Sequence, residues 1–106
     1  MAQFKVYRNL DAATRTTTPY LLDVQSDLLS DLSTRVVAPL RLAAHYSGKS
    51  MATLMPGFSV EGQEVIALIQ QLAAVPPRAI GAEVADLSDQ RFDIVAALDF
   101  FLISGY

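Results

Sequence analysis

The sequence predicts a mostly β fold, in which a curled antiparallel sheet or small barrel packs against one C-terminal α-helix. Three observations support this prediction. Short runs rich in aromatic and β-branched residues recur over the first 80 residues, turn-forming residues separate these runs, and helical periodicity dominates only in residues 86–106. A chain of 106 residues is long enough for one core, so we expect residues 1–106 to form a single domain.

The first predicted strand is Gln3–Arg8, where apolar and polar residues alternate. The polar, Thr-rich segment 9–19 is expected to be a loop that leads to a second strand, Tyr20–Gln25, paired antiparallel with the first. Leu28 and Leu29 follow at the end of that strand. Because successive side chains of a strand point to opposite faces, one leucine should point outward, unless both are buried at the strand end.

The middle of the chain predicts further strands. A third strand is expected over Thr34–Leu40, and Pro39 within it indicates a sheet edge or a bulge. Residues 41–49 fit either a helical turn or a continuing strand. Residues 53–60 and 63–70 flank Glu61-Gly62, a pair typical of a tight hairpin turn. Residues 72–80 contain two prolines and predict a short extended piece at an edge, after which Gly81 would turn the chain toward the helix.

The terminal segment 86–106 predicts the helix, with Ser88 as N-cap and Gly105 near its end. Its expected core stripe consists of Ile94, Leu98, Phe101 and Leu102, flanked by Val95 and Ala97. The opposite side is also apolar except for one carboxylate, and consists of Phe92, Ala96, Asp99, Phe100 and Ile103. This side is either buried in the chain's own domain or contacts another protein, and we favour the second alternative.

Composition limits the classes of function. The chain has no cysteine, which excludes disulfides and thiolate metal sites and fits a reducing compartment. We expect a cytoplasmic protein, because the N-terminus lacks the apolar stretch of a secretory signal and no segment is long enough to span a membrane. Residues 83–106 carry a net charge of −4 and residues 1–82 a net charge of +1. This distribution disfavours direct DNA binding through a broad basic face.

No pattern of catalytic residues is apparent. His45 is the only histidine, without a second metal ligand or a triad partner, so we interpret it as structural or surface-exposed. Asp23 and Asp27 lie too far apart along a strand end to form a carboxylate dyad. We therefore predict no cofactor and no metal, and a protein that acts by binding and not as an enzyme.

Four segments resemble the CcdB family of toxins: FKVYRN at 4–9, DVQSDLL at 23–29, TRVVAPL at 34–40 and AVPPRAIGAEVADLS at 74–88. The resemblance covers nearly the whole chain in order. It implies a homodimer with an SH3-like barrel and a C-terminal helix. It also implies a toxin of a toxin–antitoxin system that binds the A subunit of DNA gyrase and traps the complex with cleaved DNA. A CcdA-like antitoxin would neutralise the toxin and repress the operon with it, so that DNA is contacted only through the antitoxin or gyrase.

The resemblance also implies which residues make the contacts. The gyrase-binding residues would be Leu28, Leu29, Asp99, Ile103, Ser104, Gly105 and Tyr106. For the antitoxin, we expect contact with the loop 9–18 and a nearby unpaired strand edge, because Arg8 and Arg15 could pair with an acidic segment.

The C-terminus differs from the family's Trp-Gly-Ile ending: Gly105 is retained, the tryptophan is absent, Tyr106 is last, and one extra residue follows Asp99. One alternative is therefore a homologue that binds the antitoxin and no longer poisons gyrase. A second alternative is a ribonuclease of the MazF type, which the acidic balance and isolated His45 argue against.

Overall fold

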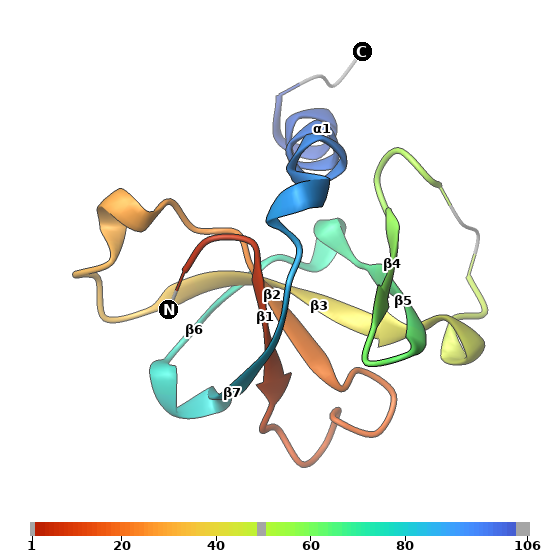
Figure 1. The fold of residues 1–106 in the computed structure, drawn as a ribbon, viewed down its shortest axis with the longest axis horizontal. Helices are drawn as coiled ribbons and strands as arrows, with labels where there is room; N and C mark the ends of the chain where they lie inside the picture. Colours follow the sequence, from red (N-terminus) through yellow and green to blue (C-terminus); the bar gives the residue numbers. More distant parts are fainter. Residues whose placement is uncertain (1, 49–50, 104–106) are drawn as a thin grey trace.

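The computed structural model describes residues 2–48 and 51–103 and confirms the predicted fold class (Figure 1). Over these residues the chain forms a curled, seven-stranded antiparallel sheet and one C-terminal α-helix. The strands are β1 (Lys5–Asn9), β2 (Tyr20–Asp23), β3 (Arg35–Leu42), β4 (Gly57–Val60), β5 (Gln63–Ala67), β6 (Ala73–Val75) and β7 (Ile80–Asp86). The helix α1 spans Arg91–Leu102.

Neighbouring strands follow the order β4-β5-β3-β2-β1-β7, and β6 pairs with β3 beside this path. The predicted antiparallel pairing of the first two strands is confirmed, with Tyr7 opposite Leu21. The predicted hairpin is also confirmed, because Val60 pairs with Gln63 across a two-residue turn. Both turn residues have positive φ, 52° at Glu61 and 78° at Gly62, as a two-residue hairpin of type I′ requires.

The expectation that Pro39 marks a sheet edge or a bulge is wrong. β3 lies inside the sheet, with β2 on one side and β5 and β6 on the other. On that second side, β6 covers residues 35–37 and β5 covers residues 40–42, so Pro39 lies where the partner strand changes. The Leu68 N–H donates to the Pro39 carbonyl at 3.0 Å. Residue 39 lies between the segment that pairs with β6 and the segment that pairs with β5. A proline is tolerated at this position because neither pairing depends on a backbone N–H from residue 39.

The expectation that Gly81 turns the chain toward the helix is also wrong, because residues 80–86 form β7, which pairs with β1. Gly81 permits a close approach in this pairing. A β-carbon at this position would lie 3.0 Å from Arg8 Cβ and 3.2 Å from the Arg8 carbonyl oxygen. Residues 80–86 lack a regular apolar–polar alternation, so the local pattern did not indicate a strand.

Ser88 does not cap the helix. It begins a 3₁₀ turn, Ser88–Gln90, that precedes α1, and the cap residue Gln90 makes no side-chain cap hydrogen bond. Instead, the Asp86 carboxylate accepts a hydrogen bond from Ser88 N–H at 2.9 Å. The hydrogen bonds from Ser88 lower the pKa of Asp86. A side chain therefore accepts a hydrogen bond at the start of the 3₁₀ turn, and none caps α1 itself.

The core fills the inner side of the curled sheet. Fully buried side chains include Val6, Leu22, Leu40 and Ile69, and the helix contributes Ile94 and Ala97. Leu98 packs partly against this cluster. The predicted core stripe is wrong for its remaining members, because Val95, Phe101 and Leu102 are 42%, 43% and 61% exposed. The helix therefore buries a narrow stripe, and the rest of its apolar surface faces outward.

Candidate protein-interaction surface

The paired leucines lie on a single 3₁₀ turn, Asp27–Leu29, which we call the leucine turn. The Leu28 N–H donates to Ser26 Oγ at 3.2 Å, and the Leu29 N–H donates to the Ser26 carbonyl at 3.0 Å. Leu28 is 94% exposed and Leu29 is 49% exposed. The expectation of an outward leucine is confirmed, although the residues form a turn and not a strand end.

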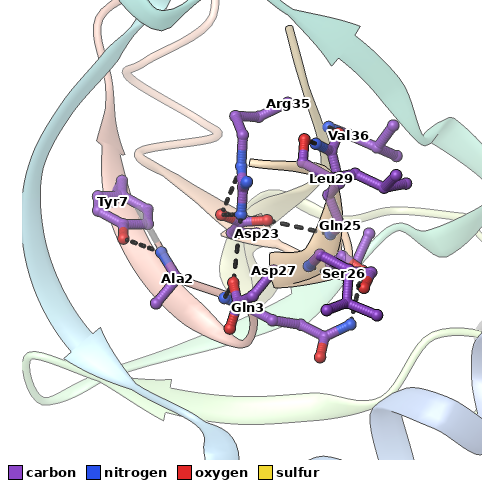
Figure 2. Close-up of polar contacts among 12 residues, drawn as sticks. Ala2, Gln3, Tyr7, Asp23, Gln25, Ser26, Asp27, Leu29, Arg35 and Val36 are labelled. Atoms are coloured by element: carbon purple, nitrogen blue, oxygen red, sulfur yellow. Dashed lines mark hydrogen bonds and ion pairs between the residues drawn. The ribbon is translucent and has the colours of Figure 1, made fainter. Parts of the chain in front are cut away.

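A buried ion pair lies behind the leucine turn (Figure 2). Arg35 donates to Asp23 Oδ2 from Nε at 3.0 Å and from Nη2 at 2.5 Å. The other carboxylate oxygen of Asp23 accepts a hydrogen bond from the Gln25 N–H at 3.0 Å. Burial raises the pKa of Asp23, and the hydrogen bonds from Arg35 and Gln25 oppose this shift.

Gln25 connects this ion pair to the turn (Figure 2). Its side-chain amide donates to the Leu29 carbonyl at 2.9 Å and accepts from the Val36 N–H at 3.0 Å. Asp27 supplies a second connection, because its Oδ1 accepts from the Gln3 N–H at 2.9 Å and lies 3.7 Å from Arg35 Nη2. The leucine turn is therefore attached both to β3 and to the N-terminal segment.

The outward face of α1 is the second apolar feature. Phe92 is 84% exposed, and Phe100 and Ile103 are 37% and 75% exposed, as predicted for the side opposite the core. Arg91, Phe92, Val95, Ala96 and Asp99 line a groove of about 450 Å³ along this face. A large apolar surface of this kind is typical of a contact with another protein.

The N-terminal segment before β1 lies between the leucine turn and the helix α1. In Figure 1 it runs between the loop that follows β2 and the start of the helix. Phe4 N–H donates to the Asp23 carbonyl at 2.6 Å, and Leu87 N–H donates to the Phe4 carbonyl at 2.8 Å. The Arg91 guanidinium lies 5.4 Å from the centre of the Phe4 ring. Phe4 also has a φ of 69°, which is unusual for a bulky residue and is typical of functional or tightly constrained sites.

Of the predicted gyrase-binding residues, Leu28 and Leu29 lie on the turn, Asp99 lies in the last turn of α1 and Ile103 directly follows the helix, and all four are exposed. Ser104, Gly105 and Tyr106 lie outside the described residues. Sequence reasoning missed the positions of Gln3, Phe4 and Gln25. Their role depends on contacts between distant segments, and only the DVQSD run pointed to this region.

The two predicted antitoxin-binding arginines differ in their surroundings. Arg8 Nη2 lies 2.8 Å from Glu61 Oε2, and Tyr20 donates its hydroxyl to Glu61 Oε1 at 2.7 Å. Burial and the hydrogen bond to Glu61 raise the pKa of Tyr20 to about 12. Arg15 is exposed in the loop between β1 and β2. β1, which carries Arg8, is paired on both sides, by β2 and β7, and β7 is the last strand of the sheet in that direction.

The described residues contain no cluster of three or more side chains suited to hold a metal ion. His45 is exposed on a 3₁₀ turn, Ala43–His45. Over the same part of the chain, no helix has the length and apolar character needed to cross a membrane. Among residues 2–48 and 51–103, the leucine turn and the outward face of α1 are therefore the surfaces best suited to binding another protein.

Comparison with known protein families identifies a match over nearly the whole chain. The family model described as CcdB protein matches residues 3–105.

Proposed function

Because the chain belongs to the CcdB family, whose members are toxins of toxin–antitoxin systems that act on DNA gyrase, we propose that it binds the A subunit of DNA gyrase and traps the complex with cleaved DNA. The observation that carries this proposal is the 94% exposed Leu28 on a well-braced turn. A hot-spot anchor of this kind contributes about 2 kcal/mol or more when a partner covers it. Leu29, Asp99, Ile103 and the terminal Ser104, Gly105 and Tyr106 extend the contact.

The protein acts as a homodimer in the cytoplasm. A two-fold dimer presents each contact residue twice to a two-fold target, so that weak contacts are reinforced through effective concentration. Poisoning follows if the dimer binds the cleaved state of gyrase more tightly than the resealed state, because a ligand shifts an equilibrium only by its differential affinity. The toxin itself supplies no bond-breaking group.

The experiment that tests this function is expression without antitoxin in gyrase-sensitive and gyrase-resistant hosts. We expect killing of the sensitive host only, and accumulation of cleaved DNA when purified protein is added to gyrase and supercoiled DNA. Deletion of residues 103–106 should leave the fold intact and abolish both effects. Killing by the truncated chain would remove the terminal residues from the site.

A CcdA-like antitoxin neutralises the toxin through a disordered acidic segment and represses the operon together with it. Arg15, and Arg8 in competition with Glu61, would attract this segment. The double substitution of Arg8 and Arg15 by alanine should weaken antitoxin binding and leave gyrase binding unchanged. Equal antitoxin affinity before and after substitution would show that the segment binds elsewhere.

The altered C-terminal ending favours one second candidate, a homologue that binds the antitoxin and no longer poisons gyrase. This candidate predicts survival of both hosts together with intact antitoxin binding. A MazF-like ribonuclease would kill both hosts and cleave RNA without added metal, an assay that the purified protein allows directly.

A further inference from the structure

The leucine turn is exposed, and one buried and one exposed polar side chain, Gln25 and Asp27, connect it to the rest of the structure (Figure 2). Gln25 is only 6% exposed, and its side chain joins the Leu29 carbonyl of the turn to the Val36 N–H of β3. Its own N–H donates to Asp23, whose charge is balanced by Arg35. Both ends of the side-chain amide are thus bonded to backbone groups, one of them on the sheet.

Asp27 holds the other end of the turn. Its carboxylate accepts the Gln3 N–H at 2.9 Å and lies 3.7 Å from Arg35 Nη2. The Asp27 side chain is 61% exposed, so the connection forms at the surface and not in the core. The same residue is therefore available for substitution without opening the buried ion pair.

From these contacts we propose that Gln25 and Asp27 are positioning residues, which fix the leucine turn in its binding conformation before the target arrives. The inference rests on the proposed function, in which Leu28 is an anchor for the gyrase A subunit. An exposed apolar side chain binds more tightly when its backbone is already ordered, because less conformational entropy is lost on binding.

Two variants test this role. Asp27→Ala removes the acceptor for Gln3, and Asp31→Ala is its control, since it deletes the same charge from an exposed position four residues later. Gln25→Glu keeps an acceptor for Val36 and replaces the donor to the Leu29 carbonyl with an oxygen. A urea unfolding curve accompanies each variant, and Asp27→Ala should unfold as the wild type does.

The first measurement is amide hydrogen exchange at Leu28 and Leu29 in the free protein. Loss of one bracing hydrogen bond should accelerate this exchange by about tenfold, while the amides of Val6 and Leu22 in β1 and β2 stay unchanged. Asp31→Ala should exchange as the wild type does. Unchanged exchange in both Asp27→Ala and Gln25→Glu would overturn the proposal, whatever the target proves to be.

The second measurement is affinity for a purified fragment of the gyrase A subunit. Asp27→Ala should bind about tenfold more weakly, and the same substitution in a Leu28→Ala background should cost nothing further, because the two residues act through one contact. Additive losses would show that Asp27 acts independently of Leu28 and would contradict the positioning role. Failure of the wild type to bind gyrase would refute the proposed function alone, since the exchange measurement still decides whether the turn is braced.

Discussion

Arg35 donates two hydrogen bonds to the same oxygen of Asp23, and the exposed fractions of the two side chains are only 5% and 0%. The second oxygen of Asp23 accepts from the Gln25 backbone, so the carboxylate is satisfied on both sides. A buried ion pair that is fully hydrogen-bonded is costly to break from one side, because the remaining charge has no water and no counter-ion.

Arg35→Met should therefore destabilise the protein by about 3–5 kcal/mol at neutral pH, measured by urea unfolding. Without Arg35, the pKa of Asp23 rises further above its ordinary value. Stability contributed by a carboxyl with a raised pKa is present at low pH and lost as pH rises. The difference in unfolding free energy between the wild type and Arg35→Met should therefore be smaller at acidic pH. The exposed Arg15→Met is the control, and an equal loss for both variants would contradict the assigned importance of the pair.

Leu28→Ala should leave stability within about 0.5 kcal/mol of the wild type, because the side chain is already 94% exposed. Its affinity for the gyrase A subunit should fall by about 30-fold, as expected from the loss of about 2 kcal/mol at an anchor. Leu32→Ala, in the same loop and 56% exposed, should bind within about threefold of the wild type. Stability and affinity can both be measured by calorimetry. A larger loss of affinity for Leu32→Ala than for Leu28→Ala would show that Leu32, and not Leu28, is the anchor.

Tyr20 should ionise late, with a pKa of about 12, when phenolate absorbance is followed during an alkaline titration. Glu61→Gln removes the nearby carboxylate charge and should lower that pKa toward 10, whereas Glu64→Gln on β5 should not. Because the folded-state pKa is raised, the stability from Tyr20 is complete below pH 10 and is lost between pH 10 and about 12. The slope would be steepest near pH 11, at about 1.1 kcal/mol per pH unit.

Gly81→Ala should destabilise the protein by about 1–3 kcal/mol, because the new methyl group meets the Cβ and the carbonyl oxygen of Arg8 across the β1–β7 pair. Gly57→Ala offers a matched control on β4, where the nearest atom to the new methyl group would be the Val65 carbonyl oxygen at 3.6 Å. Thermal unfolding of the two variants compares them directly. Equal melting temperatures would contradict the close packing at Gly81.

Local signals in the sequence predicted those elements that local interactions determine. Glu61-Gly62 fixes its hairpin through the φ angles of two residues, and the terminal helix, Arg91–Leu102, lies inside the range 86–106 that its local sequence predicted. Pro39 and residues 80–86 were misjudged because their surroundings depend on strands far away in the chain. Phe101 and Leu102 carry the right periodicity for a core, yet the sheet covers only the part of the helix around Ile94 and Ala97. The outward leucine was predicted, whereas its bracing by Gln25 and Asp27 depends on tertiary contacts that no local pattern encodes.

The pairing of β1 with β7 joins residues 5–9 to residues 80–86, which lie far apart in the chain. During synthesis, β1 therefore cannot pair with β7 until residue 86 has left the ribosome. Such long-range pairing slows folding, since the chain loses entropy in closing a large loop before the contacts form. The β1–β7 pair is therefore the last part of the sheet that a newly made molecule can complete.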